Sequence, residues 1–296
     1  KANTSEFEKE KADYELQKNK LSLQVAKTYE QIVYWQHQER LYSYLDSLYQ
    51  NFSKASDRRF ELGETNYLEK ITAQSKYRQI KTKLTQINFE KKAQYESLQA
   101  LVQSDEKISI LEKELVPIPT LDTTSNKAIH TAYLESISKM YKSQISLQKQ
   151  HWLPDLNLEY FQGRNNGLSQ SLYGFQVGIA VPILFSGNVS KTKVAQLESQ
   201  SWEEQKQNQE QKMMQFIRQQ QNEIAKYQES INYYNATGKK LSEEIIKVAN
   251  SSYKNGEIDF FQYIQSLENA VAIKIEYVEA VLQFNSNQLE LHYLNF

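Results

Sequence analysis

Apolar side chains recur mostly every three, four or seven residues along the first sixty residues of the chain. This spacing places them on one face of an α-helix, so we expect a single long helix over residues 4–61. At ~1.5 Å per residue, such a helix would be on the order of 87 Å long. The stripe consists of Phe7, Tyr14, Leu21, Val25, Tyr29, Ile32, Trp35, Leu41, Leu45, Leu48 and Phe52.

A second helical stripe follows over residues 66–103, and Gly63 lies between the two. Glycine readily takes the positive φ that ends a helix, and Thr65 or Asn66 can cap the next one. We therefore expect residues 1–103 to form a long antiparallel helical hairpin whose tip lies near residues 62–66. Pro117 and Pro119 exclude a helix in the segment that follows. Residues 104–151 are expected to form an irregular connection and then a shorter helix over residues 124–151.

The period changes from 3.6 to 2 over residues 152–187, where apolar and polar residues alternate in two segments joined by a polar turn. This pattern is typical of a β-hairpin. Strands of about 9 and 13 residues suit membrane-spanning strands, which need ~9–11 residues. Half-buried strands of a soluble sheet are the alternative. One face of the second strand is wholly apolar and is expected to face lipid: Phe175, Val177, Ile179, Val181 and Ile183.

The last region, residues 188–296, repeats the organisation of the first. Helical patterns over residues 188–254 and 259–292 flank Gly256, which lies 193 residues after Gly63, so a second tip is expected near residues 255–258. At this offset several apolar or acidic positions match, which indicates a duplicated helical hairpin. The matched pairs are Phe60 with Tyr253, Glu64 with Glu257, Tyr67 with Phe260, Ile71 with Ile264, Ile80 with Ile273, Leu98 with Leu291, and Leu101 with Leu294.

Composition agrees with long exposed helices and excludes several classes of protein. The 296 residues include only 8 Gly and 4 Pro, and the mean hydropathy is -0.70. A net charge of -1 gives no reason to expect nucleic acid as a partner. Cysteine is absent, which excludes disulfides and cysteine-based zinc sites. No run of about 18 apolar residues predicts a transmembrane helix, and no signal peptide is visible. Because the chain starts within a charged helical pattern, we expect it to be a fragment or a processed product.

The sequence contains no set of residues typical of catalysis, cofactor binding or metal binding. The four histidines lie on separate predicted elements, and neither a Gly-x-Ser-x-Gly motif nor a phosphate-binding loop occurs. The adjacent Met213 and Met214 point about 100° apart on a helix, which favours packing over metal contact. We therefore expect no enzyme, no cofactor and no metal site.

Three segments resemble the TolC family of outer-membrane efflux proteins. They are Val181-Pro182-Ile183-Leu184-Phe185-Ser186-Gly187, Phe60-Glu61-Leu62-Gly63 and Tyr253-Lys254-Asn255-Gly256. The resemblance covers essentially the whole chain. It implies a mainly α fold, in which long, coiled-coil-like antiparallel helical hairpins are combined with one β-hairpin that contributes to a trimeric transmembrane β-barrel.

The resemblance also implies where the protein acts and with which partners. The expected assembly is a homotrimer in the outer membrane and periplasm of a Gram-negative bacterium, in contact with outer-membrane lipid. A periplasmic adaptor (membrane fusion) protein would dock at the tips, and an inner-membrane pump of the resistance-nodulation-division type would supply the energy. The implied adaptor-docking residues are Phe60, Leu62, Gly63, Glu64, Tyr253, Asn255, Gly256 and Glu257. The first strand pair of such proteins is missing from this chain.

The implied entrance constriction differs from that of some family members. Those members carry acidic residues just past the second tip glycine, whereas the corresponding positions here are Gln262 and Gln265, with Asp259 nearby. An amide ring would narrow the entrance without the negative field that binds cations.

The expected function is that of a passive export conduit, the outer-membrane channel subunit of a tripartite efflux system. The segments Phe260-Phe261-Gln262-Tyr263 and Leu289-Glu290-Leu291 are similar to the metal-exporting branch of the family, which makes metal cations a candidate cargo. The alternative is a structural coiled-coil scaffold or secretion-tethering protein without channel activity. The alternating segment at residues 155–185 separates the two hypotheses, because a scaffold needs no strands that face lipid.

Overall fold

The computed structural model describes residues 2–104, 106, 108–112, 114–164, 171–181 and 186–294. Within these residues, the regular structure consists of helices and one antiparallel pair of strands. This composition confirms the expected mainly α fold. None of the helices in the described ranges combines the length and the apolar character needed to cross a bilayer.

The chain divides into two compact units, each of which takes segments from both halves of the sequence. One unit contains Lys1–Gln17 and Lys127–Met213, and the other contains Lys18–Asn126 and Met214–Phe296. This division follows spatial contacts, whereas the four regions expected from the pattern are consecutive in the sequence. Those four regions stay a prediction about how the chain is organised in its assembly.

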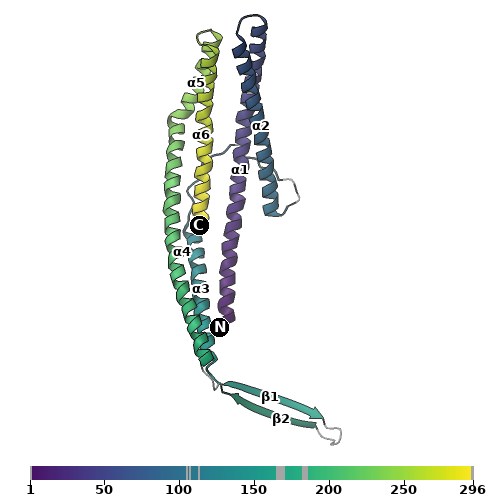
Figure 1. The fold of residues 1–296 in the computed structure, drawn as a ribbon, viewed down its shortest axis with the longest axis vertical. Helices are drawn as coiled ribbons and strands as arrows, with labels where there is room; N and C mark the ends of the chain where they lie inside the picture. The colour runs from purple at the N-terminus through teal and green to yellow at the C-terminus, as the bar shows by residue number, and fades with distance from the viewer. Residues whose placement is uncertain are drawn as a thin grey trace. The chain divides into compact units, whose positions relative to one another are not determined.

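The first helical hairpin consists of α1 (Ala2–Glu61) and α2 (Tyr67–Val102), which run antiparallel (Figure 1). Both lie within two residues of the ranges expected from the apolar stripes. The segment that contains Pro117 and Pro119 is irregular wherever it is described, and α3 (Thr124–Gln150) follows it. α2 already ends at Val102, where the C-cap Gln103 has a φ of 51°. Pro117 and Pro119 then oppose a helix in their own part of the segment, since proline lacks the N–H that a helix interior requires.

The second helical hairpin contains a feature that the sequence pattern did not predict. The expected helix over residues 188–254 is divided into α4 (Ser186–Tyr233), a π-helical turn η1 (Tyr234–Gly238) and α5 (Lys239–Lys254). The helix α6 (Phe260–Tyr293) returns antiparallel to α5 (Figure 1). Gly238 is buried in this turn, where an added Cβ would lie 3.2 Å from Cγ2 of Ile273.

The unit built from Lys18–Asn126 and Met214–Phe296 has two clusters of buried apolar residues. One cluster lies close to the tips and joins α1, α2, α5 and α6. It consists of Leu45, Tyr49, Ala73, Ala249, Phe260, Tyr263, Ile264, Leu267 and Val271. The other joins α1, α4, α6 and the irregular segment. It consists of Val33, Tyr34, Leu115, Ile231, Val278, Ala280, Val281, Leu282 and Phe284.

One buried amide attaches the irregular segment to the helices. The side chain of Asn285 is fully buried, and its Nδ2 donates to Glu30 Oε2 at 2.7 Å and to the Val116 carbonyl at 2.9 Å. Its Oδ1 accepts from the Ile118 N–H at 2.9 Å. Burial raises the pKa of Glu30, and the hydrogen bond from Asn285 opposes that rise. Asn285, on α6, therefore pairs with polar groups of two other segments, α1 and the irregular segment.

The other unit contains the β-hairpin and the parts of α3 and α4 that pack together. The indole Nε1 of Trp202 donates to Ser138 Oγ at 2.9 Å, and its ring stacks on Tyr141 with the centroids 6.2 Å apart. After α3, the chain continues into β1 (Asp155–Arg164) and β2 (Ser171–Ala180), which pair antiparallel (Figure 1).

Candidate functional site

The first tip reverses the chain through a Schellman motif. Gly63 has φ +74°, and its N–H donates to the Phe60 carbonyl at 3.0 Å. The Glu64 N–H donates to the Arg59 carbonyl at 2.8 Å. These two bonds pair the carbonyls that the end of α1 leaves free, and glycine is the residue that takes the required positive φ without strain.

The second tip has the same hydrogen bonds at the positions 193 residues further along. Gly256 has φ +71°, its N–H donates to the Tyr253 carbonyl at 3.2 Å, and the Glu257 N–H donates to the Ser252 carbonyl at 2.8 Å. The two tips are therefore equivalent in backbone structure, as the internal repeat led us to expect.

Each returning helix begins at an N-cap three residues after the tip glycine. Asn66 Oδ1 accepts from the Glu69 N–H at 2.9 Å, so Asn66, rather than Thr65, is the cap of α2. Asp259 caps α6 in a capping box: its Oδ1 accepts from the Gln262 N–H at 2.8 Å, and Gln262 Oε1 accepts from the Asp259 N–H at 3.1 Å. Both returning helices thus start at fixed residues.

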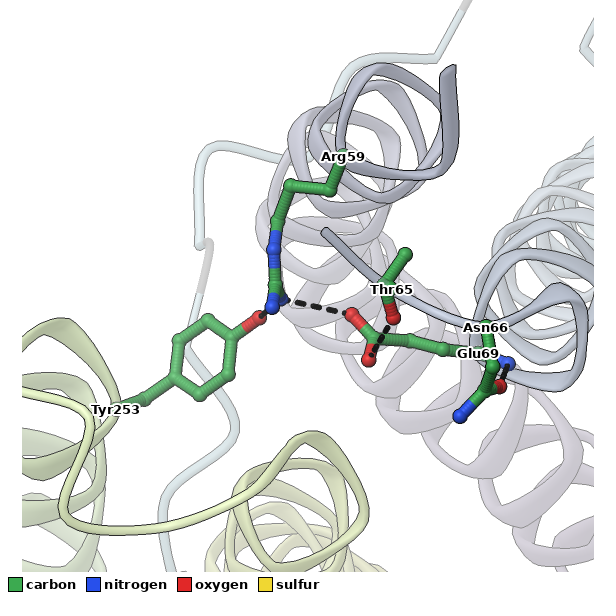
Figure 2. A network of polar contacts seen from close by, with 5 residues as sticks. All are labelled: Arg59, Thr65, Asn66, Glu69 and Tyr253. Carbon is green, nitrogen blue, oxygen red and sulfur yellow. Dashed lines mark hydrogen bonds and ion pairs between the residues drawn. The ribbon is translucent and has the colours of Figure 1, made fainter. Parts of the chain in front are cut away.

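A network of side chains connects the two tips (Figure 2). The carboxylate of Glu69 is buried and accepts from Thr65 Oγ1 at 2.5 Å and from Arg59 Nη1 at 2.9 Å. The same Arg59 nitrogen donates to the phenol oxygen of Tyr253 at 3.0 Å. Arg59 lies on α1 and Tyr253 on α5, so one guanidinium bridges the first hairpin to the second. Figure 2 shows the guanidinium between the carboxylate and the phenol ring.

Aromatic rings pack directly behind this network. Phe52 of α1 stacks on Phe260 with the centroids 4.7 Å apart, and it also contacts Tyr253 and Tyr263 at 5.7 and 5.5 Å. Tyr253 and Tyr263 stack on each other at 4.6 Å. Because rings from α1, α5 and α6 share one cluster, the two tips form one continuous platform within the chain.

The β-hairpin is the second part of the candidate site. Cross-strand partners in the register are Leu156 with Ile179, Leu158 with Val177, and Tyr160 with Phe175, so these six side chains share one face. All six are exposed. The opposite face carries mainly polar or small residues, among them the pairs Asn157 with Gly178 and Glu159 with Gln176, together with the exposed ring of Phe161 opposite Gly174. The hairpin therefore has a continuous apolar face that nothing within its compact unit covers.

Comparison with known proteins identifies the family. The profile of the outer membrane efflux protein family matches residues 138–294, which is more than half of the chain. The chain belongs to this family. A search of curated proteins found no match to the sequence.

Solved structures of outer-membrane proteins share the fold. The channel CmeC of Campylobacter jejuni has a TM-score of 0.81 at 15% identity, covering 99% of this chain and 66% of the channel. VceC of Vibrio cholerae has a TM-score of 0.80 at 16% identity, covering 99% and 73%. The open MtrE channel of Neisseria gonorrhoeae has a TM-score of 0.77 at 15% identity, covering 99% and 69%. The chain thus spans about two thirds to three quarters of the length of these proteins.

Membership of the outer membrane efflux family settles several expectations from the sequence. It places the protein in the outer membrane and periplasm of Gram-negative bacteria. It also confirms that the protein is a transport component and not an enzyme. The resemblance to the TolC family is confirmed at the level of the family, while the metal-exporting branch stays a prediction.

In this efflux protein, the predicted docking residues surround the tips but differ in exposure. Leu62, Gly63, Glu64, Asn255, Gly256 and Glu257 are exposed. Phe60 and Tyr253 are half-buried, and Tyr253 belongs to the network that joins the tips. The role of these residues in docking stays a prediction.

Sequence reasoning missed two exposed apolar residues, Leu68 and Phe261. Each lies two residues after the N-cap of its returning helix, and the two are separated by the same 193 residues as the tip glycines. Both are exposed, although they lie beside a packed aromatic cluster. The repeat offset was the signal that could have identified them.

The predicted entrance residues have local roles that the sequence did not show. Asp259 and Gln262 form the capping box of α6, so their polar atoms are used at the helix start. Gln265 is exposed one turn further along the helix. The constriction by these residues stays a prediction.

Of the residues predicted to face lipid, Phe175, Val177 and Ile179 lie on one face of β2, while their contact with lipid stays a prediction. Val181 lies one residue beyond the end of β2 and is exposed. Ile183 lies outside the described residues.

Replacing Gly63 or Gly256 by valine should strain the tips and impair efflux while the protein still forms trimers. Nothing lies within 4 Å of a Cβ at either position, so the penalty arises from the positive φ alone, roughly 1–2 kcal/mol for a residue other than glycine or asparagine. The matched control is asparagine, which tolerates this conformation. The measurement is dye export from cells together with native mass of the purified protein. Full export by both valine variants would refute a role for the tips in efflux.

Proposed function

We propose that this chain is the channel subunit of a tripartite efflux system, a passive conduit that forms a homotrimer in the outer membrane. The β-hairpin contributes strands to a shared barrel, and the helical hairpins line a periplasmic tunnel. The tips dock a periplasmic adaptor protein, and an inner-membrane pump of the resistance-nodulation-division type drives export. The observation that carries the proposal is the uncovered apolar face of a two-stranded hairpin in a chain with duplicated helical tips.

The β-hairpin is an argument for a barrel, because two strands without further partners do not form a stable sheet in water. A two-stranded hairpin is marginal by itself, and the outer edges of β1 and β2 carry unpaired backbone groups. In a bilayer each of these groups needs a partner, and closure with strands of other copies provides it. The apolar face then contacts lipid and the polar face lines the lumen. A coiled-coil scaffold has no use for such a face, which favours the channel over that alternative.

The tips support docking because they combine rigidity with exposed apolar side chains. Schellman motifs, N-caps and the Arg59 network fix the backbone on both hairpins. Leu68 and Phe261 project from this fixed platform at equivalent positions. A preorganised platform with apolar anchors loses little conformational entropy when a partner binds.

Replacing both Leu68 and Phe261 by aspartate should abolish adaptor binding while the trimer persists. Each change places a charge where an apolar anchor would be desolvated by the adaptor, and a lost anchor typically costs about 2 kcal/mol or more, so binding should weaken by at least thirtyfold. The measurement is co-purification of the adaptor from membranes, with native mass as the test of assembly.

The matched control is Phe89→Asp, because Phe89 is also a large exposed side chain on α2 but lies far from the tip. Its adaptor binding should equal that of the unmodified protein. Undiminished co-purification with the double aspartate variant would argue against docking at the tips.

We propose that the pump, and not this chain, selects the cargo, with metal cations as one candidate. Among the described residues, no three His, Cys, Asp or Glu side chains are grouped so that they could hold a metal ion. His37 instead accepts from the Leu115 N–H, and burial lowers its pKa. Comparing the sensitivity of a deletion strain to copper, zinc and dyes would test the cargo.

A further inference from the structure

The duplicated tips differ in what covers them. Phe260 and Tyr67 are equivalent by the 193-residue offset, yet Phe260 is 3% exposed and Tyr67 is 62% exposed. The next equivalent pair differs in the same direction: Ile264 is 5% exposed, and Ile71 is 38% exposed. The second hairpin therefore buries a face that the first hairpin leaves open.

The cover over the second hairpin is the first hairpin of the same chain. Phe52 of α1 stacks on Phe260, and Leu45 and Tyr49 of α1 belong to the same buried cluster. Applying the offset to Phe52 gives Ile245 on α5. When the same packing is repeated between two copies of the chain, the surface around Ile245 of one copy is the one that covers Tyr67 of the other.

Ile245 lines an apolar hollow of about 330 Å³ on the second hairpin. Its other apolar walls are Val248, Ala249 and Ile258, and Val248 is exposed. Polar groups of Glu244, Ser252 and Ser266 also line it. A tyrosine suits such a hollow, because its ring fills the apolar part while its hydroxyl reaches a polar partner.

We propose that Tyr67 of one copy inserts into the hollow around Ile245 and Val248 of a second copy of this chain. The contact is heterologous, since the two copies contribute different surfaces, and repeating it by rotation closes a ring. The proposal rests on the trimer of the proposed function and names the surfaces that join its subunits at the tips. A second copy is the occupant, because the equivalent face of the second hairpin is covered by a hairpin of this same sequence.

The contact is confined to the tip. Leu267 and Val271 of α6 are buried, but their equivalents on α2 are Gln74 and Arg78. The face of α2 thus becomes polar within two turns of Tyr67 and lines a groove whose side chains are mostly polar. The contact between copies therefore buries less apolar surface than the contact within a chain and is the weaker of the two.

Cross-linking in the full-length protein tests the proposal directly, because residues 1–296 contain no cysteine of their own, and the unsubstituted protein gives the background of disulfide-linked product. Two differently tagged variants, Tyr67→Cys and Val248→Cys, are expressed together and oxidised in outer membranes. We expect a disulfide-linked dimer that carries both tags and is absent when either variant is expressed alone. The matched control pairs Val248→Cys with Phe89→Cys, an exposed position on α2 far from the tip, and should give no product.

Three other outcomes would overturn the proposal. If the native mass shows a trimer but no mixed disulfide forms, Tyr67 does not lie in this hollow, and the proposed channel function is unaffected. Native mass that shows a monomer would contradict both the contact and the proposed channel. A mixed disulfide that forms equally with the Phe89→Cys control would show random collision and not a specific contact.

Discussion

Replacing Asn285 by leucine should lower the free energy of unfolding of its unit by about 3 kcal/mol, because each buried polar group left without a partner costs about 1–3 kcal/mol. Leucine has the same number and branching of side-chain heavy atoms as asparagine but can neither donate nor accept a hydrogen bond. The change leaves the Val116 carbonyl, the Ile118 N–H and the Glu30 carboxyl without their partner. Water cannot easily replace it, since the Asn285 side chain is fully buried.

Hydrogen exchange measures this effect at a single amide, and urea denaturation measures it on the stability of the fold. Exchange of the Ile118 amide should accelerate in Asn285→Leu, because that amide loses its acceptor, and the urea midpoint should fall. The control is Asn232→Leu, since Asn232 is exposed on α4 and bonds only Gln228 of the same helix. Equal midpoints in the two variants would mean that Asn285 does not hold the irregular segment in place.

Replacing Val177 by arginine should prevent stable insertion into the outer membrane. Val177 lies in the middle of the apolar face, opposite Leu158, and is exposed. An arginine on the lipid face costs about 2–4 kcal/mol at the bilayer midplane, and a homotrimer carries the change in every subunit. The expected result is loss of the heat-resistant trimer from outer-membrane fractions.

The neighbouring residue provides the control for this substitution. Gln176 lies on the opposite, polar face of the same strand, paired with Glu159. Gln176→Arg introduces the same side chain toward the proposed lumen and should leave insertion unchanged. Equal trimer yields for the two variants would contradict a lipid-facing role for the apolar face.

The tips show how far local sequence chemistry can predict structure. Gly63 and Gly256 were identified as chain reversals because only glycine takes positive φ without strain, and both have it. Asn66 was one of two candidate caps and is the residue that caps α2. The alternation over β2 predicted which side chains share a face, because successive residues in a strand point to opposite sides.

Contacts between distant segments could not be predicted in this way. Arg59 and Tyr253 meet only because α1 and α5 pack together, and no local pattern indicates that these two residues pair. The π-helical turn at Tyr234–Gly238 was also not recognised, because five residues are too few to define a period of their own. Asn285 resembled any other polar residue on a helix until the irregular segment was placed against it.

The sequence by itself determined the helices, both tips, the strand pair and its apolar face, because propensity, capping and periodicity act between residues close in the chain. Only the tertiary structure decided which of two equivalent faces is buried. Tyr67 and Phe260 hold equivalent positions in the repeat, each directly after the N-cap of its helix, yet one is exposed and the other is covered by Phe52. Burial depends on which segment packs against a residue, and that segment can lie two hundred residues away in the sequence.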